Sequence, residues 1–211
     1  MKAERQTTYR IAQKQHQQAL RQGVLDDASN LLMKEGPAAL SMRRIAKLVG
    51  CSTMTLYTLF GNKQGVVDQL YLRGFELLRQ ALESVPHTGA PLDYVWALCY
   101  AYRQFAMDNS SYYAIMFANP VPEYTPPEAS RQTGEKGFIL LVQAVQGCRV
   151  VSPITQAESW DIARMIWATL HGHVSLALAK HFDEVTLPAS LLERSLKTIF
   201  DTLLVDEESA V

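Results

Sequence analysis

Hydrophobic residues recur along this chain at intervals of three and four positions, and no stretch alternates between hydrophobic and polar residues with a period of two. Such spacing places hydrophobic side chains on one face of a helix, so the pattern predicts an all-α protein. Glycine, proline and N-cap residues separate the expected helices. These helices run over about residues 15–34, 42–49, 53–60, 63–85, 91–108, 110–118, 128–148, 155–182 and 188–204.

Two of the expected helices, 42–49 and 53–60, are short and are separated by a tight turn. Ser41 and Ser52 are suitable N-caps for them, and Gly50 can close the first. This arrangement predicts a helix-turn-helix unit, whose second helix enters the major groove of a DNA duplex. The second helix is rich in small hydroxyl side chains, which can donate to phosphates or base edges without holding the helix away from the duplex.

The charge is unevenly distributed, although the whole chain carries only −1. Residues 1–63 contain ten basic and four acidic residues, whereas residues 64–211 contain ten basic and seventeen acidic ones. A basic first third favours a polyanion as partner of that part of the chain. A solvated basic tail fits the charges equally well, so charge alone leaves both interpretations open.

Residues 40–67, LSMRRIAKLVGCSTMTLYTLFGNKQGVV, resemble the N-terminal domain of the TetR family of bacterial transcriptional regulators. That family typically has Ser or Thr before its second helix, an Ile-Ala pair within it and Gly at its end. A Ser, a Leu-Tyr pair, a Phe and a Lys follow. This chain matches the pattern at Ser41, Ile45, Ala46, Gly50, Ser52, Leu56, Tyr57, Phe60 and Lys63, and departs from it at Met54, Gln64 and Gly65.

The resemblance implies an N-terminal three-helix DNA-binding domain and a larger helical domain for effector binding and dimerisation. We expect a flexible basic arm over residues 1–15, the helix-turn-helix domain over 16–63, a connecting helix over 64–86 and the larger domain over 87–211. The expected partner of the first domain is a double-stranded DNA operator. The residues implied to face its phosphates or bases are Ser41, Arg43, Arg44, Thr53, Met54, Thr55, Tyr57, Thr58 and Lys63.

These assignments have structural alternatives. Tyr57 could instead pack under the following helix, and Thr55 could be an ordinary residue of a first helical turn. Arg43, Arg44 and Lys63 each fall in the first turn of a predicted helix, where a cation is otherwise unfavourable. Their placement therefore favours a phosphate bound close to those helix starts.

The resemblance continues more faintly through residues 166–178, IWATLHGHVSLAL, which are similar to the Trp…His-Gly segment of a C-terminal subfamily of the WHG type. Residues 92–151 are unusually rich in aromatic and methionine side chains. Such a stripe is more often core than binding site, but comparable helices of this family enclose an effector cavity. The residues expected to contact a small, largely apolar or aromatic effector are Trp96, Tyr102, Phe105, Met116, Phe117, Phe138, Trp167 and His171. His171 could alternatively be a buried histidine that fixes helix packing.

A homodimer is expected, because two half-sites are needed to distinguish one operator from a genome of competing sequences. The resemblance implies a four-helix interface made by the last two helices of each protomer. Their apolar residues are Ile162, Ile166, Leu170, Leu176, Leu191, Leu192, Leu196, Ile199 and Leu203. The alternative is that these residues complete the core of a single protomer.

The favoured function is therefore a homodimeric repressor that an effector releases from a pseudo-palindromic operator. One alternative keeps the DNA-binding domain but makes the larger domain a protein-interaction module without a ligand. A less favoured alternative is a small all-α enzyme that uses His171. The sequence offers no carboxylate pair, no nucleophile beside a base and no glycine-rich phosphate loop, so no catalytic residue is assigned.

The sequence predicts neither a metal nor a cofactor, and no membrane partner. The three cysteines are widely spaced, and His171 and His173 would lie on different faces of a helix. The longest apolar run, from Tyr94 to Tyr102, has nine residues and is too short to span a bilayer. The opening residues, MKAERQTTYR, lack the apolar core of a secretory signal. A cytoplasmic location is expected.

Overall fold

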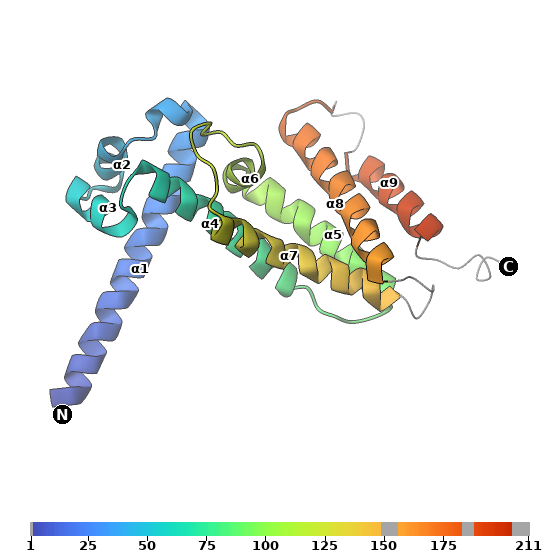
Figure 1. The fold of residues 1–211 in the computed structure, drawn as a ribbon, viewed down its shortest axis with the longest axis horizontal. Coiled ribbons are helices and arrows are strands. Elements are labelled where there is room, and N and C mark those ends of the chain that lie inside the picture. Colours follow the sequence, from blue (N-terminus) through green and yellow to red (C-terminus); the bar gives the residue numbers. More distant parts are fainter. Residues whose placement is uncertain (1, 149–155, 183–187, 204–211) are drawn as a thin grey trace. The chain divides into compact units, whose positions relative to one another are not determined.

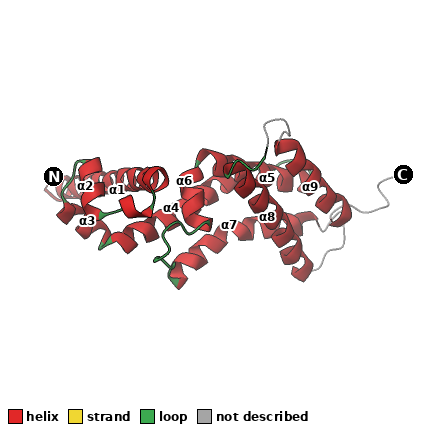
Figure 2. Cartoon of the chain, turned by 90° about the horizontal axis from the view of Figure 1, so that it is seen from above, coloured by secondary structure: helices red, strands yellow, loops and turns green. Residues whose placement is uncertain are grey.

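The computed structural model describes residues 2–148, 156–182 and 188–203. Every regular element in these ranges is a helix, which confirms the predicted all-α class (Figures 1 and 2). The elements are α1 (Lys2–Glu35), the short 3-10 helix η1 (Pro37–Ala39), α2 (Met42–Val49), α3 (Thr53–Phe60), α4 (Lys63–Glu83), α5 (Pro91–Asp108), α6 (Ser110–Phe117), α7 (Glu128–Gly147), α8 (Gln156–Leu178) and α9 (Pro188–Leu203).

Local capping explains why the bounds of α2 and α3 agree with the prediction. The Ser41 hydroxyl accepts from the Arg44 amide at 3.3 Å, and the Ser52 hydroxyl accepts from the Thr55 amide at 3.0 Å. Each bond satisfies a backbone donor that has no partner inside the helix. Gly50 ends α2 with φ 73°, a left-handed conformation that glycine adopts without steric cost.

Two helix ends differ from the prediction. α1 begins at Lys2, so the segment expected as a flexible arm over residues 1–15 is instead helical from its second residue. Residues 2–22 contain neither proline nor glycine, and no local signal interrupts the helix. α8 ends at Leu178 rather than 182, because Lys180 adopts the left-handed φ of 57° that turns the chain out of the helix.

The chain divides into two compact units, here called the head and the body. The head comprises Met1–Gly74 and Ser111–Ser130, and the body comprises Phe75–Ser110 and Arg131–Val211. This division differs from the predicted ranges, because half of α4, nearly all of α6 and the irregular connection after α6 belong to the same unit as the helix-turn-helix. The chain therefore passes from one unit to the other within α4, at the start of α6 and near the start of α7.

The head is built on the C-terminal half of α1, with α2 and α3 packed beside it (Figure 1). Its most deeply buried side chains include Val24 and Leu32 of α1, Ile45 of α2 and Leu56 of α3, each at most 2% exposed. These side chains recur at helical spacing, which is the pattern from which the helices were predicted. The core fixes α3 by one edge and leaves the other edge to solvent.

The body contains α5, α7, α8, α9 and the second half of α4, and α8 packs against both α5 and α9. Five of the nine residues expected at a dimer interface lie in the core of the protomer: Ile162, Ile166, Leu170, Leu192 and Leu196. For these five the alternative interpretation is correct, because each is at most 5% exposed. Leu176 and Leu191 are 45% and 40% exposed, so they remain available to a partner.

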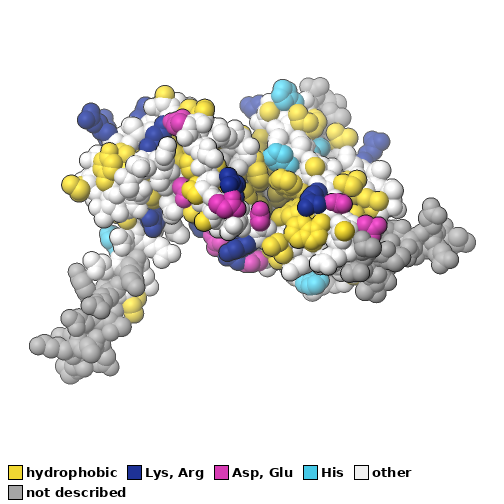
Figure 3. Space-filling view, in the orientation of Figure 1, with side chains coloured by type: hydrophobic (Ala, Val, Ile, Leu, Met, Phe, Trp, Pro, Cys, Tyr) yellow, Lys and Arg dark blue, Asp and Glu magenta, His cyan; other side chains and the backbone are white. Residues whose placement is uncertain are grey.

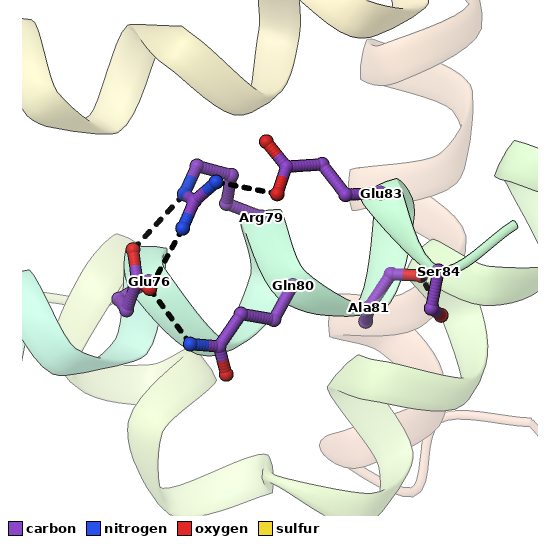
Figure 4. Close-up of polar contacts among 6 residues, drawn as sticks. All are labelled: Glu76, Arg79, Gln80, Ala81, Glu83 and Ser84. Carbon is purple, nitrogen blue, oxygen red and sulfur yellow. Dashed lines mark hydrogen bonds and ion pairs between the residues drawn. The ribbon is translucent and has the colours of Figure 1, made fainter.

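The second half of α4 carries an ion-pair cluster on its surface (Figure 4). Arg79 donates from two guanidinium nitrogens to Glu76, at 2.8 and 3.0 Å, and from a third to Glu83. Hydrogen bonds to Glu76 and then to Glu83 raise the pKa of Arg79. Pairs at these spacings lie on one face of a helix and support its last turns, which is a structural role.

Candidate functional site

The exposed edge of α3 is the first candidate site. Leu56, Leu59 and Phe60 are buried and attach α3 to the head. On the opposite edge, Met54 is 73% exposed and Tyr57 is 51% exposed. The suggestion that Tyr57 packs under the following helix is therefore wrong. Hydrophobic side chains also reach the surface over α2 and α3 in the space-filling view (Figure 3).

The hydroxyl groups of α3 are not equivalent. Thr55 Oγ1 lies 2.9 Å from the capping hydroxyl of Ser52, and Thr58 Oγ1 donates to the Met54 carbonyl at 2.9 Å. These two hydroxyls are already engaged within the helix. Thr53 is exposed one helical turn before Tyr57, so these two residues lie on the same side of α3.

The residues predicted on α2 lie at the surface of the head. Ser41 caps the helix, and Arg43 and Arg44 are both exposed. The Arg44 guanidinium forms an ion pair with the carboxylate of Glu35 in the last turn of α1. A phosphate that binds Arg44 has to compete with this carboxylate, whereas no such pair is found for Arg43 among the described residues.

Lys63 lies at the start of α4, as predicted, but it already has two partners. Its ammonium donates to the Glu123 carboxylate at 2.9 Å and to the Pro37 carbonyl at 3.3 Å. The hydrogen bond from Lys63 is the main cause of a lowered pKa of Glu123, so this carboxylate stays ionised. The ammonium group that was expected to bind a DNA phosphate is thus already paired with Glu123. Sequence reasoning missed Glu123, because sixty positions separate it from Lys63 and no local pattern joins them.

A buried hydrogen-bond cluster holds the connection between α6 and α7 on the head. Asp68 Oδ1 of α4 accepts from the Tyr124 hydroxyl at 2.7 Å and from the Ser130 hydroxyl at 2.8 Å. Tyr124 and Ser130 are 6% and 5% exposed. Burial and the hydrogen bond to Asp68 both raise the pKa of Tyr124, so its hydroxyl remains a donor. This Asp68 cluster positions the connection that carries Glu123.

α6 is also fastened to the head. The buried Tyr112 donates to Asp26 of α1 at 2.7 Å. A Cβ atom at Gly74 would lie 2.6 Å from the sulfur of Met116, so the absence of a side chain at Gly74 lets α4 and α6 approach closely. α6 therefore contacts two of the helices that carry the head.

The body contains a cluster of aromatic rings from α5, α7 and α8. The Phe138 ring centroid lies 5.8 Å from Trp160 and 6.0 Å from Trp167, and the Trp167 centroid lies 5.9 Å from His171. The Trp167 indole donates to the Tyr102 hydroxyl at 3.3 Å. The structure thus brings together four of the predicted effector residues. Sequence reasoning missed Trp160, which precedes Trp167 by two helical turns on the same face.

The aromatic cluster is partly open to solvent. Phe138, Trp160 and His171 are half-buried, whereas Trp167 is 37% exposed. The Arg164 guanidinium lies 5.6 Å from the centre of the Trp160 ring and pairs with Asp161. Figure 3 shows an apolar patch with a cation beside it over α7 and α8. Burial lowers the pKa of His171, which favours its neutral form.

The other predicted effector residues lie elsewhere. Trp96 packs edge-on against Phe200 of α9 at 4.7 Å, and Phe105 is a buried core residue. Met116 and Phe117 belong to the head, whereas the aromatic cluster belongs to the body. The prediction took the large side chains between residues 92 and 151 as a single source of effector contacts. In the structure they lie on different faces of their helices and in different parts of the molecule.

Replacing Glu123 by glutamine is expected to raise the affinity of the head for DNA. The substitution removes the carboxylate charge that competes with a DNA phosphate for the Lys63 ammonium. We expect the affinity to rise roughly threefold at low salt, which corresponds to the free energy of one exposed ion pair. Fluorescence anisotropy with a labelled duplex at two salt concentrations measures it, and the gain should shrink as salt increases. Glu135→Gln removes an equal charge from α7 and serves as the control. If Glu123→Gln bound DNA with unchanged or reduced affinity, Glu123 would not compete with a phosphate for Lys63.

No helix among the described residues is long and apolar enough to cross a membrane. In the same part of the chain, no group of three or more His, Cys, Asp or Glu side chains could hold a metal ion.

Two family models match the chain. Residues 24–70 match the model described as bacterial regulatory proteins, tetR family. Residues 95–202, about half of the chain, match the model described as tetracyclin repressor-like, C-terminal domain. None of the curated proteins is significantly similar to the chain in sequence.

Solved structures share the fold. A protein of unknown function from Rhodococcus sp. RHA1 has a TM-score of 0.75 and 26% identity over 88% of this chain and 95% of that chain. PfmR, a TetR family transcriptional regulator from Thermus thermophilus, has a TM-score of 0.62 and 17% identity over 72% and 84% of the two chains. HI0893, a TetR-family transcriptional regulator from Haemophilus influenzae RD, has a TM-score of 0.67 and 18% identity over 87% and 97%.

Proposed function

Because the chain belongs to the TetR family of bacterial transcriptional regulators, we propose that it is a homodimeric repressor, released from a pseudo-palindromic operator by a small effector. The family consists of DNA-binding regulators rather than enzymes, and the matched residues 24–70 form its DNA-binding domain. The effector class is apolar or aromatic. The half-exposed aromatic cluster around Trp167 carries that part of the proposal, because rings of this kind bind apolar and planar ligands.

The operator binds along the exposed edge of α3 and the cations beside it. Thr53, Met54 and Tyr57 face the groove, and Arg43 and Lys63 bind the phosphates on either side. Ser41, Arg44, Thr55 and Thr58 act close to this surface, Ser41 and Thr55 through the caps of α2 and α3. The arrangement is supported by exposure: the apolar edge of α3 is buried, and the edge with hydroxyl groups and Met54 is open.

Effector binding reaches the head through the segments that the two units share. α4 and α6 both continue from the body into the head, and α6 is hydrogen-bonded to α1 through Tyr112 and Asp26. A ligand that binds the body more tightly in one arrangement of these segments shifts the protein towards it. The operator affinity then falls by the ratio of the ligand affinities for the two states.

The test combines two measurements on the full chain. A panel of apolar and aromatic compounds is screened by thermal shift, and each stabilising compound is added to a complex of the protein with the DNA beside its own gene. The expected result is at least one compound that raises the melting temperature and releases the DNA. A compound that stabilises the protein without releasing the DNA would not be an effector. If no compound stabilises the protein, the result favours the alternative in which the body binds another protein.

Replacing Tyr57 by alanine is expected to weaken operator binding about tenfold, because a hydrogen bond to a charged group such as a phosphate contributes about 1.5 to 3 kcal/mol. Tyr57→Phe should retain the ring and lose only the contribution of the hydroxyl. Since half of the side chain is exposed, neither change should alter the melting temperature by more than a degree or two. Tyr100→Ala, at an exposed tyrosine of the body, is the control. Operator affinity that is the same for Tyr57→Ala and wild type would remove Tyr57 from the DNA surface.

A further inference from the structure

The recognition edge of α3 lacks the side chains that usually identify a base by hydrogen bonds. Its sequence, TMTLYTLF, contains no Arg, Lys, Asn, Gln, Asp or Glu. Bidentate contacts to guanine or adenine require Arg, Lys, Asn or Gln, and cytosine is read by Asp or Glu. The hydroxyls of Thr55 and Thr58 are already engaged within the helix. Hydrogen-bond readout by α3 is therefore limited.

Because few side chains of α3 can identify a base by hydrogen bonds, the exposed apolar side chain of Met54 is the next candidate for reading the sequence. At 73% exposed it is the most solvent-accessible large hydrophobic residue among those whose side chains the structure describes. An apolar side chain of this size gains free energy only when another apolar surface covers it. The one apolar group on the major-groove edge of a base pair is the C5-methyl of thymine. The thioether of methionine is flexible and polarisable, so it can follow such a group into the groove.

We propose that Met54 determines operator specificity by contacting thymine C5-methyl groups, so that the preferred half-sites present thymine where α3 enters the groove. The proposal rests on the DNA-binding role of the head. The cations lie on α2 and at the start of α4: Arg43 is exposed, and Lys63 is paired with Glu123, with which a phosphate has to compete. Phosphate contacts set the position of α3, and the methyl contact then selects the sequence.

The experiment replaces thymine by deoxyuridine, which lacks only the methyl group. Duplexes that bind the full-length protein are first selected from a random library. Each thymine of the selected half-site is then replaced singly, and affinity is measured by fluorescence anisotropy at one fixed salt concentration. At the thymine beside Met54 the wild type should bind about fourfold more weakly, the loss expected for one buried methyl group.

The variants make the assignment specific. Met54→Ala should bind the thymine and deoxyuridine duplexes equally, whereas Met54→Leu should retain most of the difference. Met33→Ala changes an exposed methionine of α1 and should behave like the wild type. The proposal is overturned if no deoxyuridine substitution weakens binding, or if the weakening persists in Met54→Ala. Sensitivity to 7-deazaguanine alone would also overturn it. If no duplex binds better than random DNA, the DNA-binding premise has failed instead.

Discussion

Replacing both Leu176 and Leu191 by glutamate is expected to produce a monomer that binds the operator roughly a hundredfold more weakly than the wild type. The two side chains are exposed on α8 and α9, and their helices pack against each other in the body. Glutamate at such positions places charge where a partner protomer would bury apolar surface. Loss of the second half-site removes the gain from binding two linked sites, which is commonly a hundredfold or more.

Size-exclusion chromatography with light scattering measures the mass, and anisotropy measures the affinity for the operator and for a single half-site. The affinity of the double variant for a single half-site should remain close to the affinity of the wild-type protein for the same half-site. Met107→Glu introduces one such charge at a 40% exposed methionine of α5 and is the control. If the double variant is still a dimer, the interface involves other residues, and the dimerisation role of this face is wrong.

Replacing Asp68 by alanine is expected to lower the free energy of unfolding by about 3 kcal/mol. The change leaves the hydroxyls of Tyr124 and Ser130 without their acceptor, and both side chains are buried. A hydrogen bond to a charged group contributes about 1.5 to 3 kcal/mol, and a buried donor without a partner costs a comparable amount. Asp68→Asn keeps an acceptor oxygen at this position and should lose much less.

Urea unfolding followed by circular dichroism measures the loss, and hydrogen exchange at the amides of α4 shows whether it arises in the head. Tyr124→Phe removes one donor together with its bond and should cost about 1 kcal/mol. Combined with Asp68→Ala, it should show a coupling of similar size, because the two groups share one interaction. A stability within about 0.5 kcal/mol of the wild type for Asp68→Ala would mean that the cluster does not stabilise the head.

The helices could be predicted because their signals are local. Ser41 and Ser52 cap helices that begin at the next residue, and Gly50 ends α2 by its conformation. The exposed edge of α3 followed from the same information, since the apolar spacing determines which side is buried. Arg43, Tyr57 and Lys63 were accordingly found at the surface of the head or close to it.

The remaining features depend on contacts between distant segments. Glu123 reaches Lys63 because the Asp68 cluster holds the connection after α6, and no spacing in the sequence indicates this. The division of apolar residues on α8 and α9 between core and surface depends on the packing of these two helices against each other and of α8 against α5. Ile166 and Leu176 are equally apolar in sequence, yet one is fully buried and the other is 45% exposed. The helical start of α1 was missed for a different reason, because a charged terminal segment was assumed to fray.

The absence of any ionisable group from α3 other than the Tyr57 phenol has a consequence for selectivity. The phosphate contacts proposed for Arg43 and Lys63 would weaken as ionic strength rises, through counterion release, on operator and random DNA alike. Contacts with methyl groups and tyrosine release no counterions, so the ratio of operator to random affinity should vary little. A bacterium under osmotic stress would then lose occupancy at all sites together, while the ranking of its promoters stayed the same.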